Sequence, residues 1–283
     1  MNEERLQELL SVYRSTRRMP VLPRRHSPGR WWLAAAAAIA VAIVIAWPRP
    51  RGAWIAEEAG RRRVLQVGES IATGPGMHAR LESNAIGVID IGPRTEIRLV
   101  EVRAKRQRLA LASGTIHAKT TSPPGVFVVD TPRAAAMDLG CEYVLSVAPD
   151  GHGLLRVTSG WVELTRGWTQ SLVPQGAHAW IEDGHLSPPV FDDAPPAFQA
   201  AVRSGDLPTV LRLSRRRDAL TLINLFRDAT PDQRLQIYDR LDVLVPAPPS
   251  IPREAMGEWT IHTLDAWWPP VMKASGVSAI KKK

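Results

Sequence analysis

The chain has 283 residues, enough for one large domain or two domains of modest size. Its composition, 45% hydrophobic and 23% charged, is that of a folded protein and excludes a wholly disordered one. The net charge of +8 suits nucleic acid or an anionic membrane surface, and the single cysteine, Cys141, excludes an intrachain disulfide and a zinc site built on paired cysteines.

Residues 1–30 predict a short tail that contains one amphipathic helix over residues 3–14. Four apolar side chains follow the i, i+3, i+4, i+7 spacing of one helical face. They are Leu6, Leu9, Leu10 and Tyr13. Prolines at positions 20, 23 and 28 end any helix after it. Such a helix either lies on lipid or binds a cytoplasmic partner, and these four residues are the candidate partner-binding residues.

The segment 31–47, WWLAAAAAIAVAIVIAW, contains no charged side chain, and its seventeen residues are the short end of what spans a bilayer as a helix. Tryptophans stand at both ends, where interfacial aromatic anchors belong, and Arg30 and Arg49 flank them. The segment predicts a single transmembrane helix. A cleaved signal peptide with a small-residue site at 44–46 is the alternative.

The orientation of this helix follows from the lengths of the flanking segments more than from their charge. Five arginines lie in the fifteen residues before the segment and four in the fifteen after it. Because positive charge concentrates on the cytoplasmic side, this small difference favours a cytoplasmic N-terminus only slightly. The short tail is easily retained in the cytoplasm, so we expect the N-terminus inside and the bulk of the chain outside. Basic residues outside the cell would not meet nucleic acid, which is therefore not an expected partner.

From about residue 60 to residue 186 the hydrophobic period changes to two, with turn residues between the runs. Many short strands predict an all-β sandwich or roll, which we assign to residues 54–190. Asp150-Gly151 and Asp183-Gly184 are hairpin signals because glycine tolerates positive φ. The pattern that begins at Ser113-Gly114 recurs at Ser159-Gly160 and predicts two hairpin units of similar build.

After a proline-rich join the period becomes helical, and residues 195–283 predict an α-helical C-terminal region. Asp206 is the expected N-cap of one helix. Thr230-Pro231-Asp232-Gln233 has the composition of a capping box. A further helix is predicted from Arg253 to Trp268, ended by Pro269-Pro270.

No catalytic, cofactor or metal site is predicted, because no nucleophile triad, phosphate loop or metal-ligand spacing can be assembled. Four histidines are expected at the surface or at strand edges: His117, His152, His178 and His185. The arginine runs 61–63 and 215–217 are expected to be solvated, with lipid headgroups as the specific partner of the first run. Cys141 is expected to be a small buried residue.

Several short motifs follow one another between residues 60 and 184. They are Val67-Gly68-Glu69-Ser70-Ile71-Ala72-Thr73-Gly74, Thr95-Glu96-Ile97, Leu109-Ala110-Leu111-Ala112-Ser113-Gly114-Thr115-Ile116, Phe127-Val128-Val129-Asp130-Thr131-Pro132, Asp138-Leu139-Gly140-Cys141-Glu142-Tyr143 and Val157-Thr158-Ser159-Gly160-Trp161-Val162. Their order and spacing resemble the FecR-like domain of membrane anti-sigma regulators. The resemblance implies an all-β domain outside the cytoplasmic membrane, behind one transmembrane helix, that relays an external signal to a sigma factor inside.

The chain departs from the family pattern at two places. Cys141 stands where the family usually has Thr, and the thirty-residue tail is much shorter than the usual cytoplasmic anti-sigma domain. We expect a sensory or regulatory protein of the bacterial inner membrane, not an enzyme, with an envelope protein and a sigma factor as partners. The alternative is an envelope scaffold protein without transcriptional output.

Overall fold

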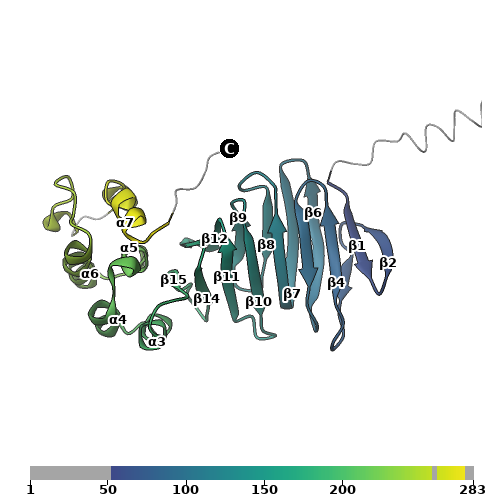
Figure 1. Ribbon diagram of the computed structural model, residues 1–283, viewed down its shortest axis with the longest axis horizontal. Helices are drawn as coiled ribbons and strands as arrows, with labels where there is room; N and C mark the ends of the chain where they lie inside the picture. The colour runs from purple at the N-terminus through teal and green to yellow at the C-terminus, as the bar shows by residue number, and fades with distance from the viewer. Residues whose placement is uncertain (1–51, 257–259, 278–283) are drawn as a thin grey trace, which may run out of the picture. The chain divides into compact units, whose positions relative to one another are not determined.

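The structure is a computed structural model that describes residues 52–256 and 260–277 (Figure 1). The predicted amphipathic helix of residues 3–14 and the predicted transmembrane segment 31–47 lie outside the described residues. Among the residues that are described, none of the helices combines the length and the apolar character that crossing a membrane requires. All described residues belong to one compact unit.

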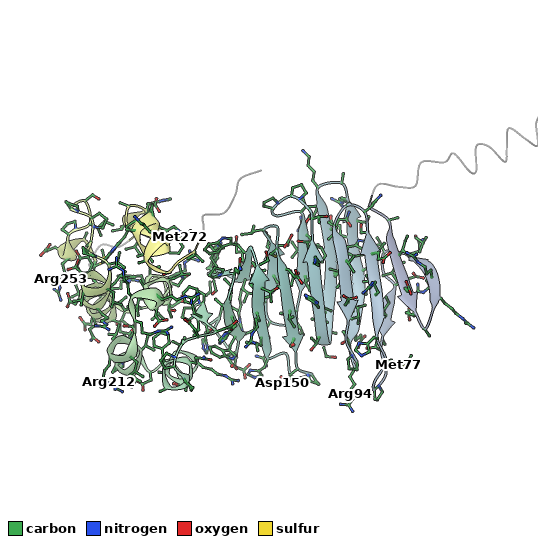
Figure 2. All side chains as sticks on the ribbon, in the orientation of Figure 1. Met77, Arg94, Asp150, Arg212, Arg253 and Met272 are labelled. Atoms are coloured by element: carbon green, nitrogen blue, oxygen red, sulfur yellow. The ribbon has the colours of Figure 1, made fainter. Side chains whose placement is uncertain are left out.

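The first sheet, sheet A, is antiparallel and has the strand order β2-β1-β4-β5-β7-β10-β11-β14-β15. Its strands are β1 (Trp54–Glu58), β2 (Arg61–Leu65), β4 (Ala79–Ser83), β5 (Gly87–Ile91), β7 (Arg106–Thr120), β10 (Glu142–Val147), β11 (Gly153–Ser159), β14 (Ala177–Ile181) and β15 (Val190–Phe191). The turn with Asp150-Gly151 joins β10 to β11, as predicted, and Gly151 has a φ of +87°. Asp150, Met77 and Arg94 mark the same end of the strands in Figure 2.

The second sheet, sheet B, has the order β3-β6-β7-β8-β9-β12-β13. Besides β7, its strands are β3 (Ser70–Ala72), β6 (Glu96–Arg103), β8 (Phe127–Asp130), β9 (Ala135–Asp138), β12 (Trp161–Arg166) and β13 (Thr169–Pro174). Its pairs are antiparallel except β7 with β8, which run parallel. The predicted mainly β fold is therefore confirmed for this part of the chain.

Strand β7 belongs to both sheets, and Ser113-Gly114 lies where it passes from sheet B to sheet A. Ser159-Gly160 lies where the chain passes from β11 in sheet A to β12 in sheet B. Both glycines have positive φ, and a Cβ would overlap Thr95 at Gly114 and the backbone of Gly140 at Gly160. The prediction of two similar hairpin units is therefore wrong, because the repeated motif marks two crossings between the sheets.

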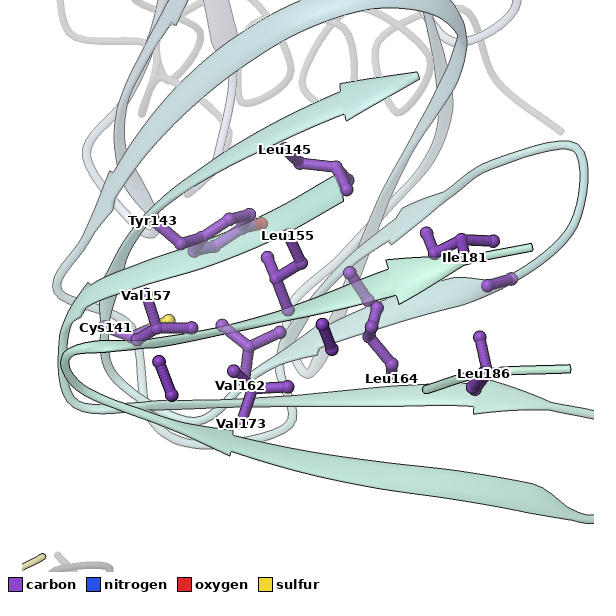
Figure 3. Packing of buried hydrophobic residues seen from close by; sticks show 14 of the residues in the cluster. Cys141, Tyr143, Leu145, Leu155, Val157, Val162, Leu164, Val173, Ile181 and Leu186 are labelled. Carbon is purple, nitrogen blue, oxygen red and sulfur yellow. The ribbon is translucent and has the colours of Figure 1, made fainter. Parts of the chain in front are cut away.

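Alternate residues of the strands point inward and form one continuous hydrophobic core. Figure 3 shows part of it, with side chains from both sheets meeting between the layers. Its fully buried members include Tyr143, Leu145, Leu155, Val162 and Leu164. The period of two in the sequence thus corresponds to one buried and one outward face of each strand.

Five α-helices follow the strands: α3 (Pro196–Ser204), α4 (Leu207–Leu213), α5 (Ala219–Leu225), α6 (Pro231–Leu244) and α7 (Trp268–Ala274). Short 3-10 turns η1 (Arg216–Asp218), η2 (Arg253–Met256) and η3 (Ile261–Leu264) lie between them. The predicted caps are confirmed. The Asp206 carboxylate accepts from the Thr209 N–H at 3.2 Å, and Thr230 and Gln233 form the reciprocal bonds of a capping box.

The predicted helix from Arg253 to Trp268 is wrong. The described parts of this stretch contain only η2 and η3, and α7 begins at Trp268, where the prediction placed a helix end. Pro269 and Pro270 lie in the first turn of α7. A proline in the first turn sacrifices no helical hydrogen bond, since the first N–H groups of a helix lack partners in any case, and so the prolines start this helix instead of stopping one.

The helical region is bound to the strands by polar contacts. The Thr221 hydroxyl donates to the carbonyl of Pro189 at 2.7 Å. Arg215 and Arg217 both hold Asp193, and the Arg217 guanidinium lies 4.3 Å from the centre of the Phe191 ring. The run 215–217 was expected to be solvated, but two of its arginines instead connect the helices to the end of sheet A.

Candidate functional site

Among residues 52–256 and 260–277, no group of three or more His, Cys, Asp or Glu side chains could hold a metal ion. Some histidines instead form pairs with acids: His117 lies 2.9 Å from Glu142, and His178 lies 2.7 Å from Asp192. His178 is only 3% exposed, so its predicted surface position is wrong. Strand β15 pairs alongside β14 at this point, and the Trp180 ring lies edge-on to the His178 ring with 4.6 Å between the ring centres.

The arginine run on β2 is also paired. Arg62 contacts Glu57 and Glu82, and Arg63 contacts Glu58 and Glu69, all on exposed surface. These carboxylates offset the positive charge that lipid headgroups would require. Because β2 is an edge strand, its charged side chains also protect the sheet from pairing with other strands.

A buried polar cluster surrounds Asp138 at the end of β9. Its carboxylate accepts from the hydroxyls of Thr120 at 2.8 Å and Ser122 at 3.3 Å, and from the backbone N–H of Cys141 at 3.1 Å. The Cys141 thiol donates to the same carboxylate. Burial raises the pKa of Asp138, and burial together with the Asp138 charge raises the pKa of Cys141. A buried thiol with a raised pKa is unreactive, so this cluster is structural.

The candidate interaction site, which we call the α3 groove, lies where α3 meets β14 and the turn before β11. Two adjoining cavities of about 490 and about 420 Å³ share three of its residues, His152, Glu182 and Arg203. Trp180 of β14 lines the second cavity. Cavities of this size fall in the range of ligand and side-chain pockets.

Glu182 organises the charges of the α3 groove. It accepts from Arg203 at 2.8 Å and lies 2.6 Å from Nδ1 of His152. Burial favours its neutral form, but the hydrogen bonds from Arg203 and His152 outweigh this and lower the pKa of Glu182. The Arg203 guanidinium also lies 5.8 Å from the centre of the Trp180 ring. An ionised, fully paired carboxylate beside a tryptophan suits binding better than proton transfer.

Trp168 is a second candidate contact residue. It lies in the turn between β12 and β13 and is 100% exposed, although tryptophan normally buries most of its large apolar ring. Tryptophan is enriched at the centres of protein interfaces, where the ring becomes desolvated. The sequence signal that could have revealed it is the pair Gly167-Trp168 between two strand-like runs.

The predicted site residues Leu6, Leu9, Leu10 and Tyr13 lie outside the described residues, so their role stays a prediction. The α3 groove was not predicted. Trp180 and Arg203 are far apart in the sequence, and no local motif links them.

These observations place the chain among two-sheet β proteins that are extended by helices. Its exposed Trp168 and its α3 groove suit the binding of a partner. A family model with the description "FecR protein" matches residues 69–163. The matched segment runs from just before β3 into β12 and includes β7, the strand that joins the sheets. The chain therefore contains a FecR-like domain, as the sequence motifs indicated.

Two similar crystal structures, at 1.65 and 2.50 Å resolution, are both described as a "putative anti-sigma factor" from Parabacteroides distasonis ATCC 8503. They share 16% identity with this chain over 44% and 47% of its length, with a TM-score of 0.39. The chain spans 60% and 64% of their lengths. No curated protein matches the chain.

Proposed function

We propose that this chain is a membrane-anchored regulator that relays an extracytoplasmic signal towards sigma-factor control. In this proposal residues 31–47 cross the inner membrane, the tail 1–30 lies in the cytoplasm, and the β domain and the helices lie outside. The observation that carries the proposal is the FecR match, which covers the centre of both sheets. Regulators of this family act by binding, which agrees with the non-catalytic character expected from the sequence.

The start of the β domain is suited to transmit a change in the domain towards the membrane. Trp54 opens β1 seven residues after Trp47, the last residue of the predicted membrane segment. Its side chain is 0% exposed, donates to Gln107 at 2.7 Å and packs 5.9 Å from the Phe127 ring centre. The β domain therefore begins at a buried, hydrogen-bonded residue that lies close in sequence to the predicted membrane segment.

The α3 groove is suited to receive the signal. Arg203 belongs to α3 and Trp180 and Glu182 belong to β14 and the turn after it, so an occupant of the groove would contact both parts of the described chain. We propose that an envelope protein binds there. This would couple the position of the helices to that of the strands.

Reporter fusions at the two ends of the full chain test the topology. Alkaline phosphatase, which is active only outside the cytoplasm, should be active when fused after residue 283 and inactive when fused before residue 1. The opposite pattern would contradict the proposal. A mature chain that begins near Trp47 would show that residues 31–47 are a cleaved signal peptide and would end the claim of a membrane anchor.

The alternative is an envelope scaffold protein with no transcriptional output, and the fully exposed Trp168 and the α3 groove would serve it as contact surfaces. Co-purification of the full chain from detergent separates the two functions. A sigma factor among the partners supports the regulator, whereas envelope proteins alone support the scaffold.

A further inference from the structure

A cavity of about 330 Å³ lies in the helical region, between α5, η3 and α7. Its apolar lining comes from Ile223 and Leu264, which are 3% and 7% exposed, and from the half-buried Trp268. Ligand pockets usually measure about 300 to 1,000 Å³, so this volume suits a small molecule. The apolar lining favours a ligand that carries an aromatic or branched aliphatic group.

The cavity has one cationic wall, formed by Arg227. The guanidinium is half-buried, and its Nη1 donates to the side-chain oxygen of Gln170 at 3.1 Å. Within the described part of the chain no carboxylate forms an ion pair with Arg227, whereas Arg215 and Arg253 each hold an aspartate. A guanidinium that is partly withdrawn from water and lacks a counter-ion favours the binding of a carboxylate, which can accept two of its N–H groups.

Asp265 lines the same cavity and lies 3.2 Å from Nδ1 of His262. Its negative charge opposes a ligand that carries a second negative group. Asn224 also lines the cavity, and since one of its two side-chain N–H groups donates to the carbonyl of Leu220, the second N–H and the side-chain oxygen are left for a ligand. The lining thus combines the cationic Arg227, apolar side chains, and the exposed Asp265, which pairs with His262.

We propose that this cavity binds a small monocarboxylate with an aromatic or branched apolar body. The carboxylate pairs with Arg227, and the body packs against Ile223, Leu264 and Trp268. This inference does not depend on the membrane anchor or on a sigma factor. It assigns a small-molecule site to the helical region, which lies outside the segment that matches the FecR family.

Isothermal titration calorimetry on the full chain in detergent tests the site with three probes of similar shape: phenylacetate, phenylacetamide and phenylethylamine. Phenylacetate should bind at least about tenfold more tightly than the neutral amide, because a hydrogen-bonded charge contributes that much discrimination. The amine should bind more weakly still. Equal affinity for the three probes, or no binding of phenylacetate, would overturn the proposal.

Two arginine variants locate the site. Arg227→Gln should weaken phenylacetate binding at least about tenfold and leave the weak binding of phenylacetamide unchanged. Arg212→Gln, on the exposed surface of α4 (Figure 2), is the matched control and should bind phenylacetate like the unchanged chain. If phenylacetate binds Arg227→Gln with full affinity, the assignment is wrong. The comparison of acid and amide on the unchanged chain decides the matter even if Arg227→Gln fails to fold.

Discussion

The indole N–H of Trp54 donates to the side-chain oxygen of Gln107 at 2.7 Å, and both residues are 0% exposed. The bond links the first strand of the β domain to β7, the strand shared by both sheets. The amide nitrogen of Gln107 has no partner in the described structure, so the Trp54 bond is the main polar contact of this side chain.

Replacing Gln107 by Leu should destabilise the chain by about 1 to 3 kcal/mol, because it leaves the indole N–H of Trp54 buried without an acceptor. Combining it with Trp54→Phe should recover part of that loss, since Phe has no donor to satisfy. Urea unfolding, followed by a spectroscopic signal of the β domain, gives the free energy of unfolding of each variant. Gln175→Leu on the exposed surface is the control and should change the stability by less than about 0.5 kcal/mol. An equal effect of the two leucine substitutions would contradict the role of the bond.

Cys141 should tolerate replacement by Ser or Thr with the fold intact, at a cost of about 1 to 2 kcal/mol. The hydroxyl can donate to Asp138 as the thiol does. Cys141→Val, which has the size of Thr without the donor, should be less stable than Cys141→Thr by about 1 to 3 kcal/mol. Thermal unfolding followed by circular dichroism ranks the variants. Equal stability of the Thr and Val variants would show that Asp138 needs no donor at this position.

The contribution of Asp138 to the stability of the chain should fall as the pH rises from about 4, where a free aspartate begins to ionise. Burial raises the pKa of Asp138 in the folded state, so the folded chain binds this proton more tightly than the unfolded chain does. The contribution is present below the unfolded pKa and is lost as the pH passes through the folded pKa. Asp138→Asn should remove this part of the pH dependence. Unfolding free energies measured between pH 3 and 8 test it, and an unchanged slope would exclude Asp138 as its source.

Tyr143 is fully buried in the core (Figure 3), and its hydroxyl has no hydrogen-bond partner in the described structure. Tyr143→Phe should therefore leave the stability unchanged or raise it by about 1 to 2 kcal/mol, since it removes a buried polar group that is unpaired. Tyr238→Phe is the matched control. The Tyr238 hydroxyl donates to the carbonyl of Ile251 at 2.8 Å, and its loss should cost about 0.5 to 1.5 kcal/mol. Destabilisation by Tyr143→Phe would mean that its hydroxyl has a partner after all.

The tail residues Leu6 and Leu10 should decide whether the chain captures a cytoplasmic partner. Replacing both by Asp should weaken binding at least about a hundredfold, because each leucine buried in a complex contributes roughly 1.5 to 3 kcal/mol. Membrane insertion, set by residues 31–47, should be unchanged. Pull-downs from cells that carry either version test this. The same partner in both would remove the anti-sigma role from this helix, and no cytoplasmic partner in either would favour the scaffold.

The local pattern of the sequence determined much of the secondary structure. Alternating apolar residues predicted the strands, Asp150-Gly151 predicted the turn between β10 and β11, and Thr230 with Gln233 predicted the start of α6. Each signal depends on neighbours within a few residues, where backbone geometry and capping act directly. The motifs of the FecR-like domain belong to the same category, and the family match confirms them.

The tertiary structure alone decided which strands share a sheet, and hence what the repeated Ser-Gly motif does. It also buried His178 and Asp138, paired Arg215 and Arg217 with Asp193, and brought Arg227 beside Gln170. These outcomes depend on contacts between residues that are distant in the chain. Burial and charge pairing follow from the summed packing of all elements, and no local period or spacing carries that information.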